Sequence, residues 1–103
     1  MKQVIVIYGV PRDPAAFDRH YAGVHIPLTR KMPHLKGFEV SCGPVAAAGG
    51  GAPVHLVAIL SYASAADLDA SLASPEGQAA VADVANFATG GATLLTIDSN
   101  SVL

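Results

Sequence analysis

The sequence predicts an α+β domain with the element order β-α-β-β-α-β and a four-stranded antiparallel sheet. Three observations carry this prediction. Four short runs are rich in β-branched residues, two longer stretches open with helix start signals, and 103 residues is the length of one ordinary domain. We therefore treat residues 1–103 as a single domain.

The first strand and the first helix are the clearest elements. Residues 4–8 (Val-Ile-Val-Ile-Tyr) favour a strand, and the following Gly-Val-Pro closes it. Asp13 before Pro14 is typical of a helix start, because Asp caps free N–H groups and proline suits the first helical position. An apolar stripe at helical spacing continues to Leu28. Pro27 lies inside this stripe and has no N–H to donate, so we expect a kink there.

Two further strands flank a glycine-rich loop. Residues 37–42 alternate in polarity and predict a strand that holds Cys42 in the core. Residues 46–53 are mainly Ala and Gly and predict a mobile hairpin loop. The run 55–60 predicts the third strand.

The last third of the chain predicts helical structure and a final strand. Ser64 caps a short helix, and Ser74 followed by Pro75 starts another. Two glycines at 90–91 end this helix, and residues 92–97 form the last strand. The complete order is that of a ferredoxin-like fold.

Both faces of the predicted sheet are apolar. In the first strand Val4, Val6 and Tyr8 face one way while Ile5 and Ile7 face the other. Helices cover one face of such a sheet, and the other face is normally polar. We therefore expect the helix-free face to pack against a second copy, so that two sheets close into a barrel around an interior cavity.

Composition excludes several classes of protein. Apolar residues make up 51% and charged residues only 14%, with a net charge of −2, which favours a buried self-interface over nucleic-acid binding. No apolar run reaches the length of a membrane helix and no signal peptide is evident, so a cytoplasmic location is expected. Together with the apolar helix-free face, this predicts a cytoplasmic homodimer. Four histidines without i, i+4 spacing predict no metal site.

His25 is the main candidate for chemistry. It follows Tyr21 by four residues, and Tyr21 follows Phe17 by four, so the three side chains share one helix face. An imidazole beside a phenol at an apolar cavity can shuttle protons near neutral pH. The alternative is a structural histidine bonded to a backbone carbonyl that the kink at Pro27 sets free.

Other polar side chains receive weaker assignments. His20 and His34 are expected at the surface, and His55 either at the cavity rim or in solvent. Asp83 and Asn86 lie on a helix face that is either solvated or at a cavity opening. The residues taken as candidate substrate contacts are Tyr8, Phe38, His55 and Phe87.

Two separated segments carry a family resemblance. Residues 13–28, with a Phe, a Tyr and a His-x-Pro-Leu end, resemble the first helix of the EthD family, and residues 74–78 with 83–87 resemble its second half. The resemblance implies a dimeric α/β barrel, in a superfamily that also holds muconolactone isomerases and small cofactor-free monooxygenases. The family's name comes from ethyl tert-butyl ether degradation.

The resemblance also implies roles for particular residues. In the related methylmuconolactone methylisomerases a helix histidine and a nearby tyrosine contact the substrate, and these roles would fall on His25 and Tyr21. Those isomerases use a cysteine near the third strand, whereas the single cysteine here is Cys42. The Trp and Asn pattern of the cofactor-free oxygenases is not evident, and Trp is absent.

Three functional hypotheses follow. The first is a cofactor-free enzyme for a small hydrophobic carbonyl compound, with His25 as acid or base and Tyr21 as donor to the oxyanion. The second is a non-catalytic binding or accessory protein that assists a partner oxygenase. The third is an oligomeric scaffold whose cavity is filled by side chains.

Overall fold

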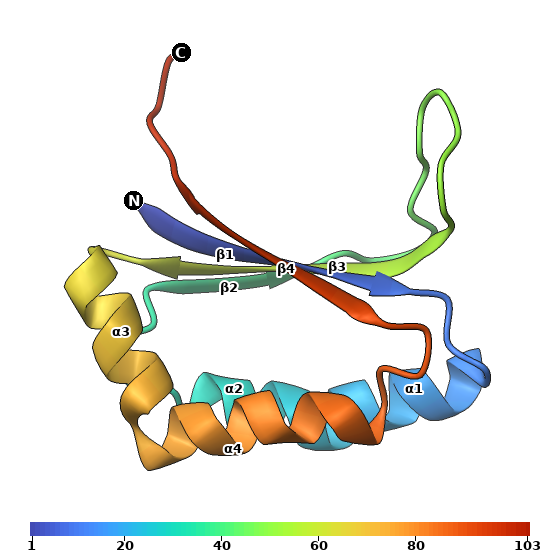
Figure 1. Cartoon of the computed structure of the whole chain (residues 1–103), viewed down its shortest axis with the longest axis horizontal. Coiled ribbons are helices and arrows are strands. Elements are labelled where there is room, and N and C mark those ends of the chain that lie inside the picture. The colour runs from blue at the N-terminus through green and yellow to red at the C-terminus, as the bar shows by residue number, and fades with distance from the viewer.

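The computed structural model describes all 103 residues and has one sheet with helices on one side of it (Figure 1). The sheet order is β2-β3-β1-β4 and every neighbouring pair is antiparallel, which is the predicted ferredoxin-like arrangement. The strands are β1 (Lys2–Gly9), β2 (Gly37–Val40), β3 (Val54–Tyr62) and β4 (Ala92–Asp98). The helical segments are α1 (Pro14–His20), η1 (Tyr21–His25), α2 (Ile26–Arg30), α3 (Ala65–Ala73), α4 (Pro75–Asp83) and η2 (Val84–Asn86).

The strand register confirms that both faces of the sheet are apolar. Val6 pairs with Ala58 on one side and with Leu94 on the other, and these three side chains face the helices. One residue earlier, Ile5 pairs with Ile59 and Leu95 on the uncovered face. The core lies on the helix side, where Tyr8, Phe17, Tyr62, Leu68 and Phe87 are among its buried members.

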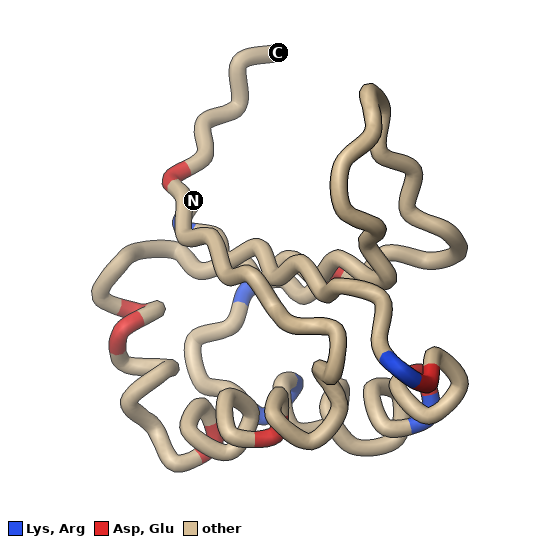
Figure 2. The backbone as a smooth tube through the Cα atoms, turned by 45° about the vertical axis from the view of Figure 1, so that its right-hand side comes forward, with Lys and Arg blue, Asp and Glu red and all other residues tan.

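Few charged residues lie in the sheet. The four strands contain only Lys2, Glu39 and Asp98, and Figure 2 shows most charged positions on the helices and near the chain ends. The uncovered face therefore presents half-buried aliphatic side chains with little charge among them. None of the helices has both the length and the apolar character that crossing a membrane requires.

The first helical stretch is irregular at the place where the sequence predicts a kink. The Asp13 side chain accepts the Ala16 N–H at 3.1 Å and caps α1. At Tyr21–His25 the helix widens into one π-helical turn, in which the Ile26 N–H bonds the carbonyl of Tyr21, five residues back. Pro27 follows immediately and has no N–H to restore the ordinary pattern.

The turn between α3 and α4 depends on a serine and a glycine. Ser74 accepts the Gly77 N–H at 3.0 Å and caps α4, as the sequence predicts. A Cβ atom at Gly77 would overlap the backbone carbonyl of Ser71 at the end of α3. The absence of a side chain at Gly77 therefore lets the two helices turn sharply against each other.

The sequence-based predictions for Cys42 and for the loop 46–53 have different outcomes. The strand β2 ends at Val40, so Cys42 lies beyond the strand and is exposed instead of lying in the core. The loop 46–53 is present, and Gly49, Gly50 and Gly51 all have positive φ angles that suit glycine. This loop and the C-terminal tail both extend from the sheet on its uncovered side (Figure 1).

Candidate functional site

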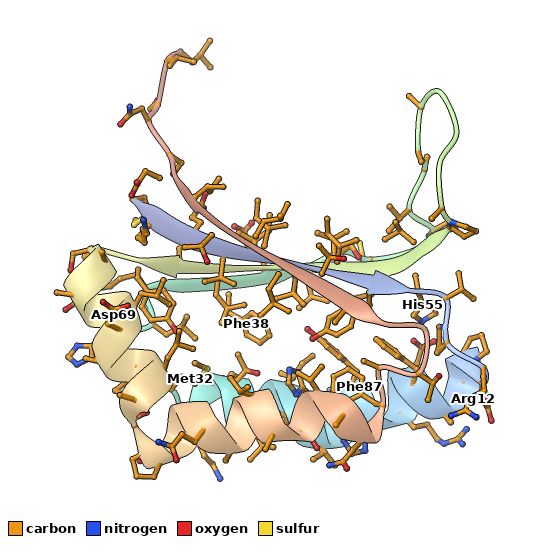
Figure 3. The ribbon with its side chains drawn as sticks, viewed as in Figure 1. Arg12, Met32, Phe38, His55, Asp69 and Phe87 are labelled. Atoms are coloured by element: carbon orange, nitrogen blue, oxygen red, sulfur yellow. The ribbon has the colours of Figure 1, made fainter.

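An apolar cavity of about 70 Å³ lies between the sheet and the helix layer of a single chain. Seventeen residues line it, of which fifteen are hydrophobic, and the two others are His25 and Thr29. The sheet contributes side chains such as Val4, Val6 and Leu60. Figure 3 shows Phe38 pointing from the sheet toward the helix layer, on the side of Met32.

The position of this cavity differs from the expected chamber between two copies. It lies on the helix-covered side of the sheet, within one chain. The physical reason is the small size of the side chains that α4 and η2 present, since Ala80 and Val84 leave space under the strands. Leu72, Val81 and Leu94 line the cavity but are exposed, so they mark its open side.

His25 is held by a buried carboxylate. Its Nδ1 lies 3.0 Å from Oδ2 of Asp83, the last residue of α4. The exposed fractions are only 7% for His25 and 6% for Asp83. The other oxygen of Asp83 accepts hydrogen bonds from His20 Nε2 at 2.8 Å and from Asn86 Nδ2 at 3.0 Å.

Two sequence-based assignments are corrected by this cluster. Asp83 was expected on a solvated helix face or at a cavity opening, but it is buried and accepts three hydrogen bonds. His20 was expected at the surface, but it is half-buried and donates to Asp83. Both differences arise because the first helical stretch packs against α4 through α2, a tertiary relationship that local sequence does not show.

The charges of this cluster follow from burial and hydrogen bonding. Burial raises the pKa of Asp83, but the hydrogen bonds from Asn86, His20 and His25 outweigh it and hold that pKa below its ordinary value. Burial also lowers the pKa of His25, and Asp83 only partly opposes this effect. His25 is therefore neutral near pH 7, with its proton on Nδ1 toward the carboxylate.

The second ring nitrogen of His25 is the one available for chemistry. No side chain or backbone group hydrogen-bonds Nε2, while Nδ1 is committed to Asp83. In this tautomer Nε2 carries a lone pair and acts as a base. His25 also lines the cavity, so its imidazole is next to any molecule bound there.

Two tyrosine hydroxyls complete the polar side of the cavity. The ring centroid of Tyr21 lies 5.1 Å from that of His25 and 5.7 Å from that of Tyr8. Burial raises the pKa of Tyr8 to about 12 and raises that of Tyr21 as well. Both hydroxyls therefore stay protonated near neutral pH.

The predicted contact residues divide into three groups. Tyr8, Phe38, Tyr21 and His25 all line the cavity. Phe87 does not line it, but its ring packs against the imidazole of His25 with centroids 4.7 Å apart, so it holds that ring in place.

His55 lies apart from this group. Its Nε2 is 2.8 Å from Oδ1 of Asp18, and its ring packs edge-on against Phe17 with centroids 4.7 Å apart. Figure 3 shows it toward the opposite end of the molecule from Met32. The cavity is therefore lined without His55.

Sequence reasoning missed Thr29 altogether and missed the pairing of Asp83 with His25. Asp83 follows Ala80 by three residues and precedes Phe87 by four, so it lies on the buried stripe of the last helical stretch. Thr29 follows His25 by four residues and continues the face that begins at Tyr21. A polar residue on an apolar stripe is the signal that points to both.

No group of three His, Cys, Asp or Glu side chains surrounds a common point that could hold a metal ion. The imidazoles of His20 and His25 bind different oxygens of Asp83. The cluster is a hydrogen-bonded network centred on the Asp83 carboxylate.

The fold and the site together define a ferredoxin-like α+β protein with an apolar cavity on the helix side and a buried His–Asp pair at its polar end. The EthD domain model matches residues 11–91, and this chain belongs to the EthD family. The family resemblance stated from the two sequence segments is thereby confirmed.

Relatives of known sequence or structure agree with this assignment. The chain is 44% identical to an uncharacterized 11.0 kDa protein from the thcB-thcC intergenic region of Rhodococcus erythropolis, over 100% of this chain and 99% of the relative. The crystal structure of an EthD family protein from Bacillus halodurans C-125 is 32% identical, with a TM-score of 0.88 over 97% of this chain and 99% of that one.

A more distant likeness concerns the fold alone. SnoaB from Streptomyces nogalater, a cofactor-independent oxygenase, superposes with a TM-score of 0.70 over 99% of this chain and 95% of that one, at 13% identity.

Proposed function

We propose that this EthD protein binds a small, largely apolar carbonyl compound in the helix-side cavity, with His25 acting on it as a general base. The observation that carries the proposal is the arrangement of the imidazole, whose Nδ1 is bound to buried Asp83 while Nε2 is unpaired beside the cavity. A base needs a lone pair at working pH, and a neutral, oriented imidazole supplies one.

The simplest reaction at such a site is removal of a proton from the carbon next to a carbonyl group. Nε2 of His25 takes the proton, the C–H electron pair forms a C=C bond, and the carbonyl π electrons move to oxygen to give an enolate. Tyr8 and Tyr21 keep their protons at neutral pH, so a hydroxyl is available to stabilise that oxygen. Return of the proton restores the ketone, and side chains alone carry the whole cycle.

The size of the cavity limits the substrate. An apolar cavity of about 150 Å³ holds one benzene molecule, whereas this cavity measures about 70 Å³. A ring-sized ligand would therefore also occupy the open side that Leu72, Val81 and Leu94 border. Compact ketones with one apolar ring or a short branched chain fit this shape best.

We also propose that two copies pack through the uncovered face of the sheet. Ile5, Ile7, Val57 and Ile59 are half-buried there without a covering layer, and Leu95 and Ile97 are exposed. The loop 46–53 and the C-terminal tail extend on that same side, where they would contact a second sheet (Figure 1). A structural neighbour from Bacteroides fragilis, 14% identical with a TM-score of 0.65, is described as dimeric with a ferredoxin-like fold.

Hydrogen exchange tests the base directly. Cyclohexanone in D₂O is incubated with the protein at pH 7, and NMR follows deuterium entering the carbons next to the carbonyl. We expect the wild type to accelerate this exchange and His25→Gln to lose at least about 100-fold of that acceleration. The matched control is His55→Gln, which changes a histidine outside the cavity and should keep the wild-type rate.

The outcomes separate enzyme from binding protein. Exchange that survives in His25→Gln contradicts the assignment of the base. Binding of cyclohexanone without any acceleration of exchange would instead favour the second hypothesis, a carrier or accessory protein that delivers its ligand to a partner oxygenase.

A further inference from the structure

One hydroxyl of the cavity lining has no hydrogen-bond partner. Thr29 Oγ1 is the only buried side-chain oxygen or nitrogen atom in the chain that lacks one, and Thr29 is 2% exposed. A buried hydroxyl without a partner costs stability, because it has given up its hydrogen bonds to water. Such a group therefore needs a reason to be there.

The usual structural use of a helical threonine does not apply. In helices the threonine hydroxyl commonly bonds the carbonyl three or four residues back, which here would be that of Ile26 or His25. Neither carbonyl accepts it, since Thr29 Oγ1 has no partner of any kind.

The position of Thr29 relates it to the proposed base. It follows His25 by four residues, so the two side chains occupy successive turns of one helix face, with Cβ atoms on the order of 5–6 Å apart. They are also the two cavity-lining residues outside the hydrophobic set. All polar character besides the tyrosine hydroxyls is thus concentrated on the η1–α2 segment.

We propose that Thr29 Oγ1 donates a hydrogen bond to the carbonyl oxygen of the ligand while Nε2 of His25 faces the adjacent carbon. This inference rests on the proposed function and deepens it by naming the substrate class: an enolisable ketone whose carbonyl and acidic C–H lie on neighbouring carbons at one end. The rest of the ligand is apolar and lies against the sheet, α3 and α4.

The proposed contact also serves the reaction. When the proton moves from carbon to Nε2, negative charge develops on the ketone oxygen, and a hydroxyl already bonded there stabilises it more strongly than it stabilises the ketone. Thr29 would therefore favour both binding and enolate formation.

The test uses a matched pair of probes and a matched pair of variants. Cyclohexanone and methylenecyclohexane have nearly the same shape, but the second replaces the carbonyl oxygen by a CH₂ group. Thr29→Val removes the hydroxyl at nearly constant volume, and Thr29→Ser keeps it. Binding of each probe is measured by NMR titration, and stability by thermal unfolding without ligand.

We expect the wild type and Thr29→Ser to prefer cyclohexanone. Thr29→Val should bind cyclohexanone about three- to tenfold more weakly and methylenecyclohexane no more weakly than the wild type. It should also unfold at a higher temperature, because an unpaired buried polar atom is gone. If the hydroxyl had a structural role, Thr29→Val would instead unfold at a lower temperature than the wild type.

Two results would overturn the inference, and they are distinguishable. If the wild type prefers cyclohexanone and Thr29→Val keeps that preference, the role of Thr29 is wrong while the proposed function stands. If the wild type binds both probes equally or neither of them, the ketone proposal fails and the inference fails with it.

Discussion

The Nδ1 atom of His25 lies 3.0 Å from Oδ2 of Asp83, across the contact between the first and the last helical stretches. This distance joins residues 58 positions apart in the sequence. Asp83 thereby fixes which ring nitrogen carries the proton, and Phe87 packs against the ring to fix its plane.

Replacing Asp83 by Asn tests that relationship. An amide can donate to Nδ1, which would move the imidazole proton to Nε2 and remove the lone pair from the cavity side. We expect Asp83→Asn to lose about 100-fold or more of any exchange activity while still binding cyclohexanone. Nitrogen-15 NMR of His25 reports the tautomer, and a spectrum unchanged from the wild type would contradict the proposed role.

The pH dependence of stability offers a second prediction. The pKa of His25 is lower in the folded protein than its ordinary value near 6.5, so between these two values the unfolded chain binds more protons. The free energy of unfolding should therefore decrease as pH falls from about 7 through the folded-state pKa. The lowered pKa of Asp83 adds a further loss at more acidic pH.

Urea unfolding from pH 2 to pH 8 measures this effect. In His25→Gln, the free energy of unfolding should decrease less steeply between pH 7 and the folded-state pKa of His25. The further loss of stability that Asp83 causes at more acidic pH should remain. A profile of identical slope in the variant and the wild type would show that His25 does not cause it.

Two neighbouring residues of β4 test the proposed dimer. Leu94 and Leu95 are both exposed, at 57% and 45%, but they point to opposite faces of the sheet. We expect Leu95→Glu to shift sedimentation toward the single chain, because it puts a charge in the proposed interface. Leu94→Glu should leave the sedimentation unchanged and weaken binding of ligands at the cavity.

The same sedimentation behaviour in both variants would contradict an interface on the uncovered face. A wild type that sediments as a single chain would contradict the proposed dimer directly.

A pair of glycines tests the packing of the helices. A Cβ atom at Gly77 would overlap the carbonyl of Ser71, whereas at Gly23 it would meet nothing within 4 Å. We expect Gly77→Ala to destabilise the protein by several kcal/mol, on the order of the larger overpacking effects. Gly23→Ala should stabilise it by up to about 1 kcal/mol, since alanine restricts the unfolded chain. Urea denaturation of both variants measures these changes.

The fold could be predicted because its signals are local. Alternating or β-branched runs identified all four strands, and the capping residues Asp13, Ser64 and Ser74 occur where helices begin. Cys42 was misplaced because the alternation of residues 37–42 continues beyond the last strand pairing, between Val40 and Ala58.

The candidate site could be predicted only in part, because it depends on contacts between distant segments. The helical spacing of Tyr21 and His25 placed them on one helix face, and both line the cavity that the structure has on the helix side of the sheet. The carboxylate partner comes from α4, and nothing near His25 in the sequence identifies Asp83. The environment of His55 was likewise undetermined, because its partner Asp18 lies 37 residues away.

The wide turn at Tyr21–His25 has a consequence for how this helix tolerates insertion and deletion. Each residue of an ordinary helix advances the side-chain direction by about 100°. Deleting one residue of this turn would let the backbone relax to a regular helix, while the residues that follow it, including Thr29, keep their direction toward the sheet. The wide turn thus gives this helix room to lose one residue without turning the polar end of the cavity away from the sheet.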